Sequence, residues 1–192
     1  MKSKTMYWLS IPIFTIKREI NFMPNDLSIN KIRFKSTALI KSWPDTIENT
    51  TSIISSHFEL QSLPKVGAFL IQKNMYIAAL SPGYYMIISD HQDLYLKLSK
   101  ILSSENAAVI DISESRRGLR LKGEASLLIL TKEIAIDLSN KTTSDFAVIQ
   151  TEIHSIGVIV FKISAEDFLI FSYSSFFESL YEWMIDSTKE LG

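Results

Sequence analysis

The sequence contains no cysteine and has few glycines and histidines. Without cysteine, the chain can form neither a disulfide nor a thiolate nucleophile, and a thiolate-ligated zinc site is excluded as well. Its six glycines form neither the G-x-x-x-x-G-K-[ST] loop nor the G-x-G-x-x-G loop that cradle phosphates. These absences argue against a nucleotide, a dinucleotide or a thiol-dependent reaction on this chain alone.

The three histidines also fail to suggest a reactive centre. His57, His91 and His154 are far apart, and no two share one face of a helix, so a metal site is not expected. No G-x-S-x-G elbow is present to hold a nucleophilic serine. We therefore predict no catalytic residue and no metal ligand on this chain.

Charge of one sign and long apolar runs are lacking too. The chain has 20 Lys and Arg residues against 21 Asp and Glu residues, so it has no excess of positive charge to attract a polyanion. Nucleic acid is therefore not an expected partner. No run approaches the ~20 apolar residues of a membrane span. The apolar start ends in Lys17 and Arg18 without a small-residue cleavage site, so we expect a cytoplasmic protein.

What the chain does have is enough apolar residues for one core. Its 192 residues suffice for one compact unit, predicted over residues 25–192. Residues 1–24 predict little regular structure and are expected to be a tail or arm lying on another chain. A hydrophobic content of 46% beside 21% charged residues is slightly apolar for a soluble monomer, which indicates a surface for a partner.

Alternation and turn residues predict the elements of the first half. In order, these are a strand over 29–40, a helix from Pro44 to Phe58 with a capping box of Asp45 and Glu48, a strand pair over 68–80 and 84–89 joined by Ser81-Pro82-Gly83, and a helix from an Asp90 cap to Ser104. Leu94, Leu98, Ile101 and Leu102 form the apolar stripe of that helix.

The second half is predicted in the same way. In order, these are a strand over 107–112, a turn over 114–117, a returning strand over 118–122, a short helix over 124–130 buried on both sides, strands over 146–153, 157–163 and 168–173, and a last helix opened by a capping box of Ser175 and Glu178. This order predicts an α+β fold of two loosely repeated ferredoxin-like β-α-β-β units with antiparallel sheets.

Two acidic positions could carry chemistry. Asp111 and Ser113 at a strand end could bind a ligand, but such side chains more often satisfy the backbone of a turn, which we favour. Asp137 could act as a general base if its apolar neighbours raise its pKa, although a cap or turn role is favoured.

The closing helix carries more aromatic surface than one core stripe needs. Phe177, Leu180, Tyr181 and Met184 recur at helical spacing and are predicted to pack in the core. We interpret Phe176, Tyr181 and Trp183 as a partner interface, with Trp183 as its anchor.

Four segments in order carry a resemblance to a known family. These are LSPGYYMIIS (80–89), AAVIDISESRRGLRLKG (107–123), AIDLS (135–139) and FFESLYEWM (176–184). Together they resemble the gamma subunit of heterotetrameric sarcosine oxidase, a family that looks like half of the glycine-cleavage T-protein, an aminomethyltransferase that handles folate. The resemblance places Asp111, Ser113, Arg116 and Gly123 in a structural motif, so the second segment is expected to be scaffold.

The resemblance also implies a function. In such an oxidase the alpha and beta subunits are expected to hold FAD, FMN, NAD and the folate, and the delta subunit a zinc, with no cofactor on gamma. The assembly oxidises sarcosine to glycine, with hydrogen peroxide and either formaldehyde or methylene-tetrahydrofolate. This chain would brace the folate-handling part of alpha, with beta and delta in the same complex.

The alternative is a stand-alone folate-binding aminomethyltransferase-like protein, because Asp137 falls where the T-protein keeps its folate-proximal carboxylate. The sequence departs from the family at Lys132 to Ile136, where a Gly-Cys-Pro-like tract is usual, and at Glu124, where a Pro is common. The chain also lacks the long C-terminal extension of the T-protein, which favours the subunit interpretation.

Overall fold

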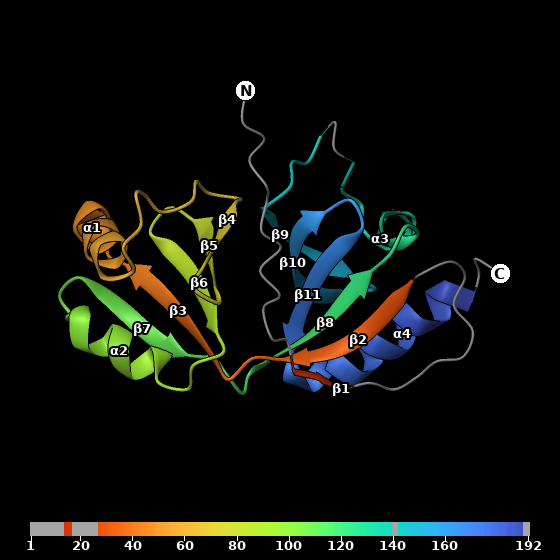
Figure 1. Cartoon of the computed structure of the whole chain (residues 1–192), viewed down its shortest axis with the longest axis horizontal. Coiled ribbons are helices and arrows are strands. Elements are labelled where there is room, and N and C mark those ends of the chain that lie inside the picture. The colour runs from red at the N-terminus through yellow and green to blue at the C-terminus, as the bar shows by residue number, and fades with distance from the viewer. Residues whose placement is uncertain (1–13, 17–26, 140–141, 190–192) are drawn as a thin grey trace, which may run out of the picture.

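Two antiparallel sheets pack face to face, and a pair of helices covers the outer face of each (Figure 1). The computed structural model describes residues 14–16, 27–139 and 142–189. The predicted N-terminal arm, residues 1–24, lies outside the described residues except for 14–16. These three residues form strand β1 (Phe14–Ile16) at the edge of one sheet.

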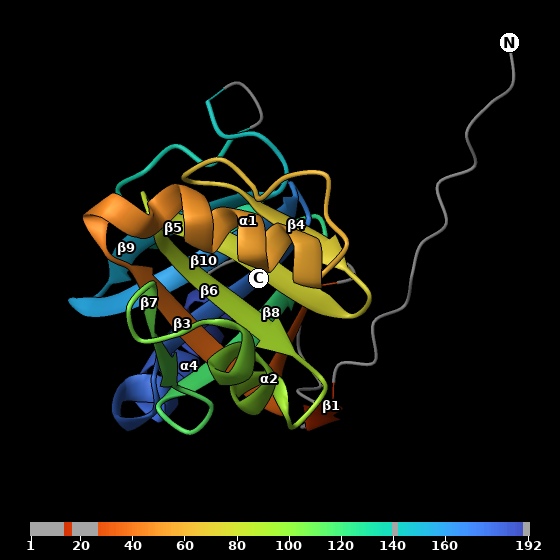
Figure 2. The same ribbon diagram turned by 90° about the vertical axis from the view of Figure 1, so that its left-hand side faces the viewer.

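The first sheet has five strands in the order β4-β5-β6-β3-β7. The strands are β3 (Ser36–Ser42), β4 (Phe69–Gln72), β5 (Met75–Ser81), β6 (Tyr84–Ser89) and β7 (Ala107–Asp111). Helix α1 (Ile47–His57), which follows a 3-10 turn over Pro44–Thr46, and helix α2 (Leu94–Ile101) lie across its outer face (Figure 2).

The second sheet has six strands in the order β1-β2-β8-β11-β10-β9. Its further strands are β2 (Ser28–Arg33), β8 (Arg116–Lys122), β9 (Ala147–Ile153), β10 (Ile156–Ser164) and β11 (Asp167–Tyr173). Helices α3 (Ser126–Glu133) and α4 (Phe177–Lys189) cover it, and a 3-10 turn over Ser174–Phe176 leads into α4.

The two sheets repeat one plan, which confirms the predicted fold class. Starting from its β7 edge, the first sheet has the strand order β7-β3-β6-β5-β4. The second sheet has the order β2-β8-β11-β10-β9, with β1 added at the outer edge of β2. Both orders are ferredoxin-like with one extra strand beyond the central hairpin. The repeat extends to detail, because both central hairpins shift register near their turns, β5–β6 at Leu80 and β10–β11 at Ile163.

One strand near the start of the chain crosses to the second sheet. Strand β2 pairs there with β8, whereas β7 pairs with β3, so all strands of the first sheet lie within residues 36–111. The linkers β2–β3 (34–35) and β7–β8 (112–115) therefore both pass from one sheet to the other, at the bottom of Figure 1. The sequence does not predict this crossing, because local patterns do not specify a strand's partner.

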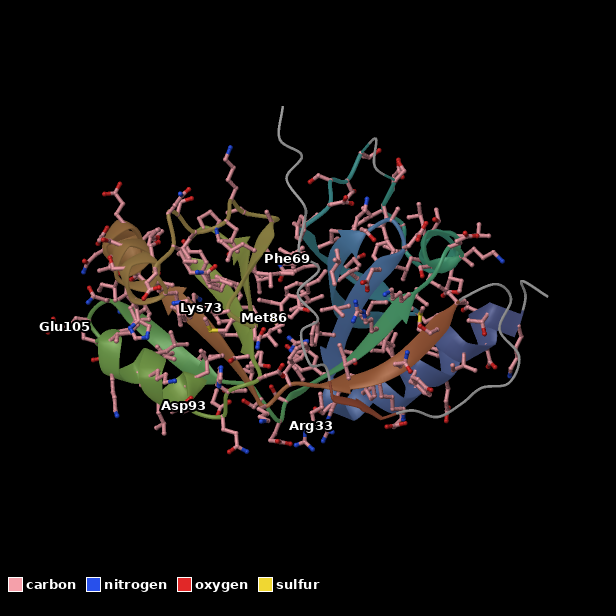
Figure 3. All side chains as sticks on the ribbon, in the orientation of Figure 1. Arg33, Phe69, Lys73, Met86, Asp93 and Glu105 are labelled. Carbon is pink, nitrogen blue, oxygen red and sulfur yellow. The ribbon has the colours of Figure 1, made fainter. Side chains whose placement is uncertain are left out.

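The core between the sheets is aromatic. Its inward-facing rings contact one another mainly at steep angles, as in the pair Phe69 and Phe161, whose centroids lie 5.0 Å apart. Figure 3 shows Phe69 and Met86 directed into this layer. The sheets also join at one side, where the amide of Phe69 donates to the carbonyl of Phe146 at 2.8 Å and that of Val148 to the carbonyl of Gly67 at 2.9 Å.

Three strand predictions are wrong in their pairing. The single strand predicted over 29–40 is two strands in different sheets, β2 and β3. The predicted returning strand is β8, which leaves β7 for the other sheet instead of forming a hairpin with it. The strand predicted over 68–80 is itself the hairpin β4–β5, whose turn residues Lys73 and Asn74 take positive φ.

The helices form close to where they are predicted, but their ends differ. Helix α1 begins without a side-chain cap, so the predicted capping box of Asp45 and Glu48 does not form. Helix α2 begins at Leu94, and Asp90 does not cap it. Helix α3 is not buried on both sides, because Leu128 is 53% exposed.

The last helix keeps its predicted stripe. Phe177, Leu180, Tyr181 and Met184 are buried against the second sheet. Glu178 pairs with Lys31 of β2, so its carboxylate contacts a neighbouring strand.

Candidate functional site

Asp111 and Ser113 meet where β7 ends, and the bonds that they make are internal. The Asp111 carboxylate accepts hydrogen bonds from the amide and the hydroxyl of Ser113, at 3.0 and 2.5 Å. The hydroxyl oxygen of Ser113 in turn accepts the amide of Thr37 at 2.9 Å. These contacts tie the end of β7 to the start of β3 and shape the link between the sheets.

The other two residues of this motif also act on their own chain. The guanidinium of Arg116 lies 3.7 Å from the centre of the Tyr173 ring, a cation–π contact between β8 and β11. Gly123 has a φ of 128°, which disfavours other residues, and its amide donates to the carbonyl of Glu166 at 2.9 Å. Gly123 thereby turns the chain from β8 toward α3.

Asp137 is an exposed loop residue with an occupied carboxylate. It accepts the hydroxyl of Thr142 at 2.5 Å and the amide of Ser139 at 2.8 Å. These hydrogen bonds, with that of Thr142 foremost, lower the pKa of the Asp137 carboxyl below its ordinary value. The raised pKa needed for the general-base alternative is therefore contradicted, because the neighbours that matter are hydrogen-bond donors and not apolar side chains.

Lys162 organises the same loop from beneath, and the sequence reasoning missed it. Its ammonium is buried and donates to the carbonyl oxygens of Leu138 at 2.7 Å and Thr143 at 2.6 Å. Burial lowers the pKa of Lys162, while Asp145 and Asp137 act in the opposite direction. A lone lysine in the apolar strand IGVIVFKIS was the signal that could have revealed it.

A second polar group, also missed, lies at one end of the layer between the sheets. Arg120 of β8 holds Asp167 of β11 through two parallel hydrogen bonds, from Nε at 2.7 Å and from an Nη nitrogen at 2.5 Å. Tyr76 of β5 lies close by, and burial raises its pKa to about 12. Both Tyr76 and Asp167 are buried. The Arg120–Asp167 pair thus joins two neighbouring strands of the second sheet, with Tyr76 of the first sheet nearby.

Asp90 is a further acid whose carboxylate oxygens are buried. Within the described part of the chain, neither of its carboxylate oxygens has a hydrogen-bond partner, although both are buried. Burial raises the pKa of Asp90, and the charges of Lys35 and His91 lower it by less. Asp90 therefore follows β6 as an acid with a raised pKa and not as the helix cap that the sequence predicts.

The three aromatic residues predicted as a partner interface lie in different environments. Phe176 is 52% exposed, ahead of α4. Trp183 is 38% exposed and packs on the ring of His154, with 4.6 Å between ring centroids. Tyr181 is buried under the ammonium of Lys31, which lies 4.4 Å from its ring centre. Only Phe176 and Trp183 thus offer ring surface to a partner.

Among residues 14–16, 27–139 and 142–189, no three His, Cys, Asp or Glu side chains gather as a metal site would require. Over the same residues, no helix has the length and apolar character needed to cross a bilayer.

The arrangement of two ferredoxin-like units, with β2 joining the second, belongs to a known class of fold. The chain is similar to glycine cleavage system aminomethyltransferase T from Bartonella henselae, with a TM-score of 0.56 and 12% identity over 78% of this chain and 43% of that one. The fold is therefore that of the T-protein, and this chain spans less than half of that protein's length.

A second solved structure is more similar and of matching size. A chain of the heterotetrameric sarcosine oxidase from Corynebacterium sp. U-96, determined in complex with pyrrole 2-carboxylate, superimposes with a TM-score of 0.77 and 22% identity. The alignment covers 85% of this chain and 84% of that one. No protein-family model matches the sequence, and neither does any curated protein. The likeness thus rests on the fold.

Proposed function

We propose that this chain is the non-catalytic gamma subunit of a heterotetrameric sarcosine oxidase. The observation that carries the proposal is the near-equal coverage of this chain and of the oxidase chain, 85% and 84%, at a TM-score of 0.77. Such coverage means that the two chains are of nearly equal length and that the match extends over most of both. The T-protein is matched over only 43% of its length.

In this role the chain braces the folate-handling part of the alpha subunit. The proposal places FAD, FMN, NAD and tetrahydrofolate on the alpha and beta subunits and zinc on delta. The complex would demethylate sarcosine to glycine, releasing hydrogen peroxide and formaldehyde or methylene-tetrahydrofolate. The half-exposed rings of Phe176 and Trp183 support a partner contact on the α4 side of the molecule.

The test is purification of the tagged chain from its native host. We expect the eluate to contain three further chains, to show flavin absorbance, and to produce hydrogen peroxide when sarcosine is added. Glycine betaine, which lacks the secondary amine of sarcosine, serves as the control substrate. A tagged chain that elutes alone, or with chains that do not oxidise sarcosine, would contradict the proposal.

Substitution of Asp137 distinguishes the proposal from the alternative, a stand-alone folate-binding aminomethyltransferase-like protein. Because its carboxylate is bonded to Ser139 and Thr142, we expect Asp137→Asn to leave turnover of the complex within about threefold. Thr142→Val is the matched variant, since it removes one of these bonds and keeps the carboxylate. A loss of about 10²-fold or more in Asp137→Asn alone, with the complex intact, would support the alternative.

A further inference from the structure

A hollow of about 510 Å³ opens beside the first turn of α4, on the outer face of the second sheet. Its walls are the end of β2, the start of β8 and the 3-10 turn before α4. The amide of Ser174 donates to the carbonyl of Ser115 at 3.0 Å, and its hydroxyl to the carbonyl of Glu114 at 2.6 Å. These bonds fix the backbone around the hollow, so its shape does not depend on a bound molecule.

Three cations line this hollow: Lys31, Arg33 and Arg117. The pairing of β2 with β8 sets Ile32 opposite Gly118, so the next residues, Arg33 and Arg117, come side by side on the same face. Like charges directly opposite each other across two strands are destabilising. Figure 3 shows Arg33 at the lower border of the molecule, directed outward.

Among the described residues, two carboxylates pair with these three cations, and both side chains are exposed. Glu114 contacts Arg33 at 2.5 Å and Arg117 at 3.8 Å, and its own side chain is 74% exposed. Glu178 pairs with Lys31 and is 71% exposed. Exposed ion pairs of this kind contribute little to stability, so another anion can replace them at small cost.

Lys31 differs from the two arginines because its position is fixed. Its side chain is 22% exposed, and its ammonium lies over the rings of Tyr181, at 4.4 Å, and Phe177, at 5.6 Å. These contacts hold one positive charge at the base of the hollow. The two arginines above it present planar N–H groups, which bind the paired oxygens of carboxylates and phosphates.

We propose that this hollow binds an oxyanion, the carboxylate or phosphate group of a small molecule, with Arg33 and Arg117 as its ligands and Lys31 beneath. The incoming anion displaces the Glu114 carboxylate, which competes for the same guanidinium groups. Glu114 thus lowers the affinity of the hollow for other anions. The proposal does not depend on the chain's role in a larger complex.

The test uses the purified full-length chain and three probes: inorganic phosphate, citrate and sodium chloride at equal ionic strength. Thermal unfolding and titration calorimetry measure binding, and the side-chain Nε–H signals of arginine in NMR spectra report its location. Four variants are compared with the parent: Arg117→Gln, Arg33→Gln, Glu114→Gln and Lys122→Gln. Lys122 is an exposed residue at the far end of β8 and serves as the matched control.

We expect phosphate or citrate, but not chloride, to bind saturably, and the stronger of the two identifies the favoured oxyanion. Each arginine variant should weaken binding about tenfold or more, because a charged hydrogen bond is lost. Glu114→Gln should strengthen binding several-fold, a gain that a merely structural Glu114 would not produce. The Lys122 variant should bind as the parent does. Absence of saturable binding, or equal binding by all variants, would overturn the proposal.

Discussion

Two aspartates of this chain have opposite environments, although both look like turn residues in the sequence. Asp137 is surrounded by donors, and its pKa is lowered. Asp90 has both oxygens buried without a donor among the described residues, and its pKa is raised. The difference arises from packing after β6, which no local pattern encodes, and it has a measurable consequence for stability.

We predict that Asp90→Asn stabilises the chain at neutral pH. A carboxyl whose pKa is raised on folding favours the folded state only while protonated, so its penalty appears as the pH rises from 3.8 through the raised pKa. The variant should gain about 1 kcal/mol in the free energy of unfolding at pH 7. Urea unfolding at pH 7 and below pH 4 measures this gain, which should shrink on acidification.

The matched control for Asp90→Asn is Asp93→Asn. Asp93 is exposed, pairs with Lys97 at 2.9 Å, and has a lowered pKa caused first by that hydrogen bond. Its loss should leave stability unchanged or slightly reduced at neutral pH, because exposed pairs contribute little. If both variants change stability in the same direction, burial of the Asp90 carboxylate is not the cause.

Lys162 gives a second prediction at this scale. Lys162→Met keeps most of the apolar side chain but removes the donor for the carbonyls of Leu138 and Thr143. We expect a loss of about 1–3 kcal/mol in the free energy of unfolding, because buried carbonyls lose a partner. Hydrogen exchange should become faster at the Ser139 amide. Unchanged stability and exchange would show that the lysine does not hold this loop.

Among the elements, β8 lies inside the second sheet and has a glycine, Gly118, between Ile32 of β2 and Phe171 of β11. A Cβ on Gly118 would lie 2.8 Å from a ring carbon of Phe171 and 2.9 Å from Cγ1 of Ile32. Both contacts are closer than van der Waals packing allows. The glycine therefore permits the aromatic core between the sheets to approach β8.

We predict that Gly118→Ala lowers the free energy of unfolding by about 1–3 kcal/mol, because it overpacks this core. Gly157→Ala on β10 is the control, since its Cβ would meet nothing within 4 Å. That variant should remain within about 0.5 kcal/mol of the parent. Thermal and urea unfolding of the two variants provide the comparison, and equal losses would refute the steric explanation.

The elements also show where sequence reasoning succeeds. The strands of the second half are predicted to within one or two residues, because their apolar patterns are long and bounded by Gly, Ser and Asp. Helix α4 is predicted from its apolar stripe, although it begins at Phe177, two residues after the predicted start. The boundary between β2 and β3 is missed, since Phe34-Lys35 contains no turn residue and the alternation continues through it. Arg120 and Asp167 are missed because they are 47 residues apart and meet only in the folded sheet.

Over the whole molecule, the predicted partner surface is reduced to two exposed rings. Trp183 packs on His154, whose Nε2 lies 2.7 Å from the Glu133 carboxylate. Ser187 of α4 donates to the same carboxylate at 2.6 Å. Trp183 therefore packs against a polar cluster that joins α3, α4 and the β9–β10 turn. An interface anchor is expected to be held in place in this way.

We predict that Trp183→Ala weakens association with the partner by about 2 kcal/mol or more and costs the free chain less than a core tryptophan would. A fully buried ring would cost ~3–5 kcal/mol of stability. Pull-down of the partner beside thermal unfolding of the free variant separates the two effects. Phe176→Ala, which removes the more exposed ring, is the comparison. A Trp183 variant that unfolds early yet still binds would show that the ring belongs to the core.

The crossing of β2 into the second sheet has a consequence for the order in which the chain can fold during synthesis. Every strand of the first sheet lies between Ser36 and Asp111, so this half can close while the ribosome is still adding the rest. Strand β2, made earlier, must wait for β8, where Ile29 meets Leu121. The inner face of the first sheet, which includes Tyr76 and Met86, remains exposed to solvent until β10 and β11 have been synthesised. Until then the nascent protein presents an aromatic surface that a chaperone can bind.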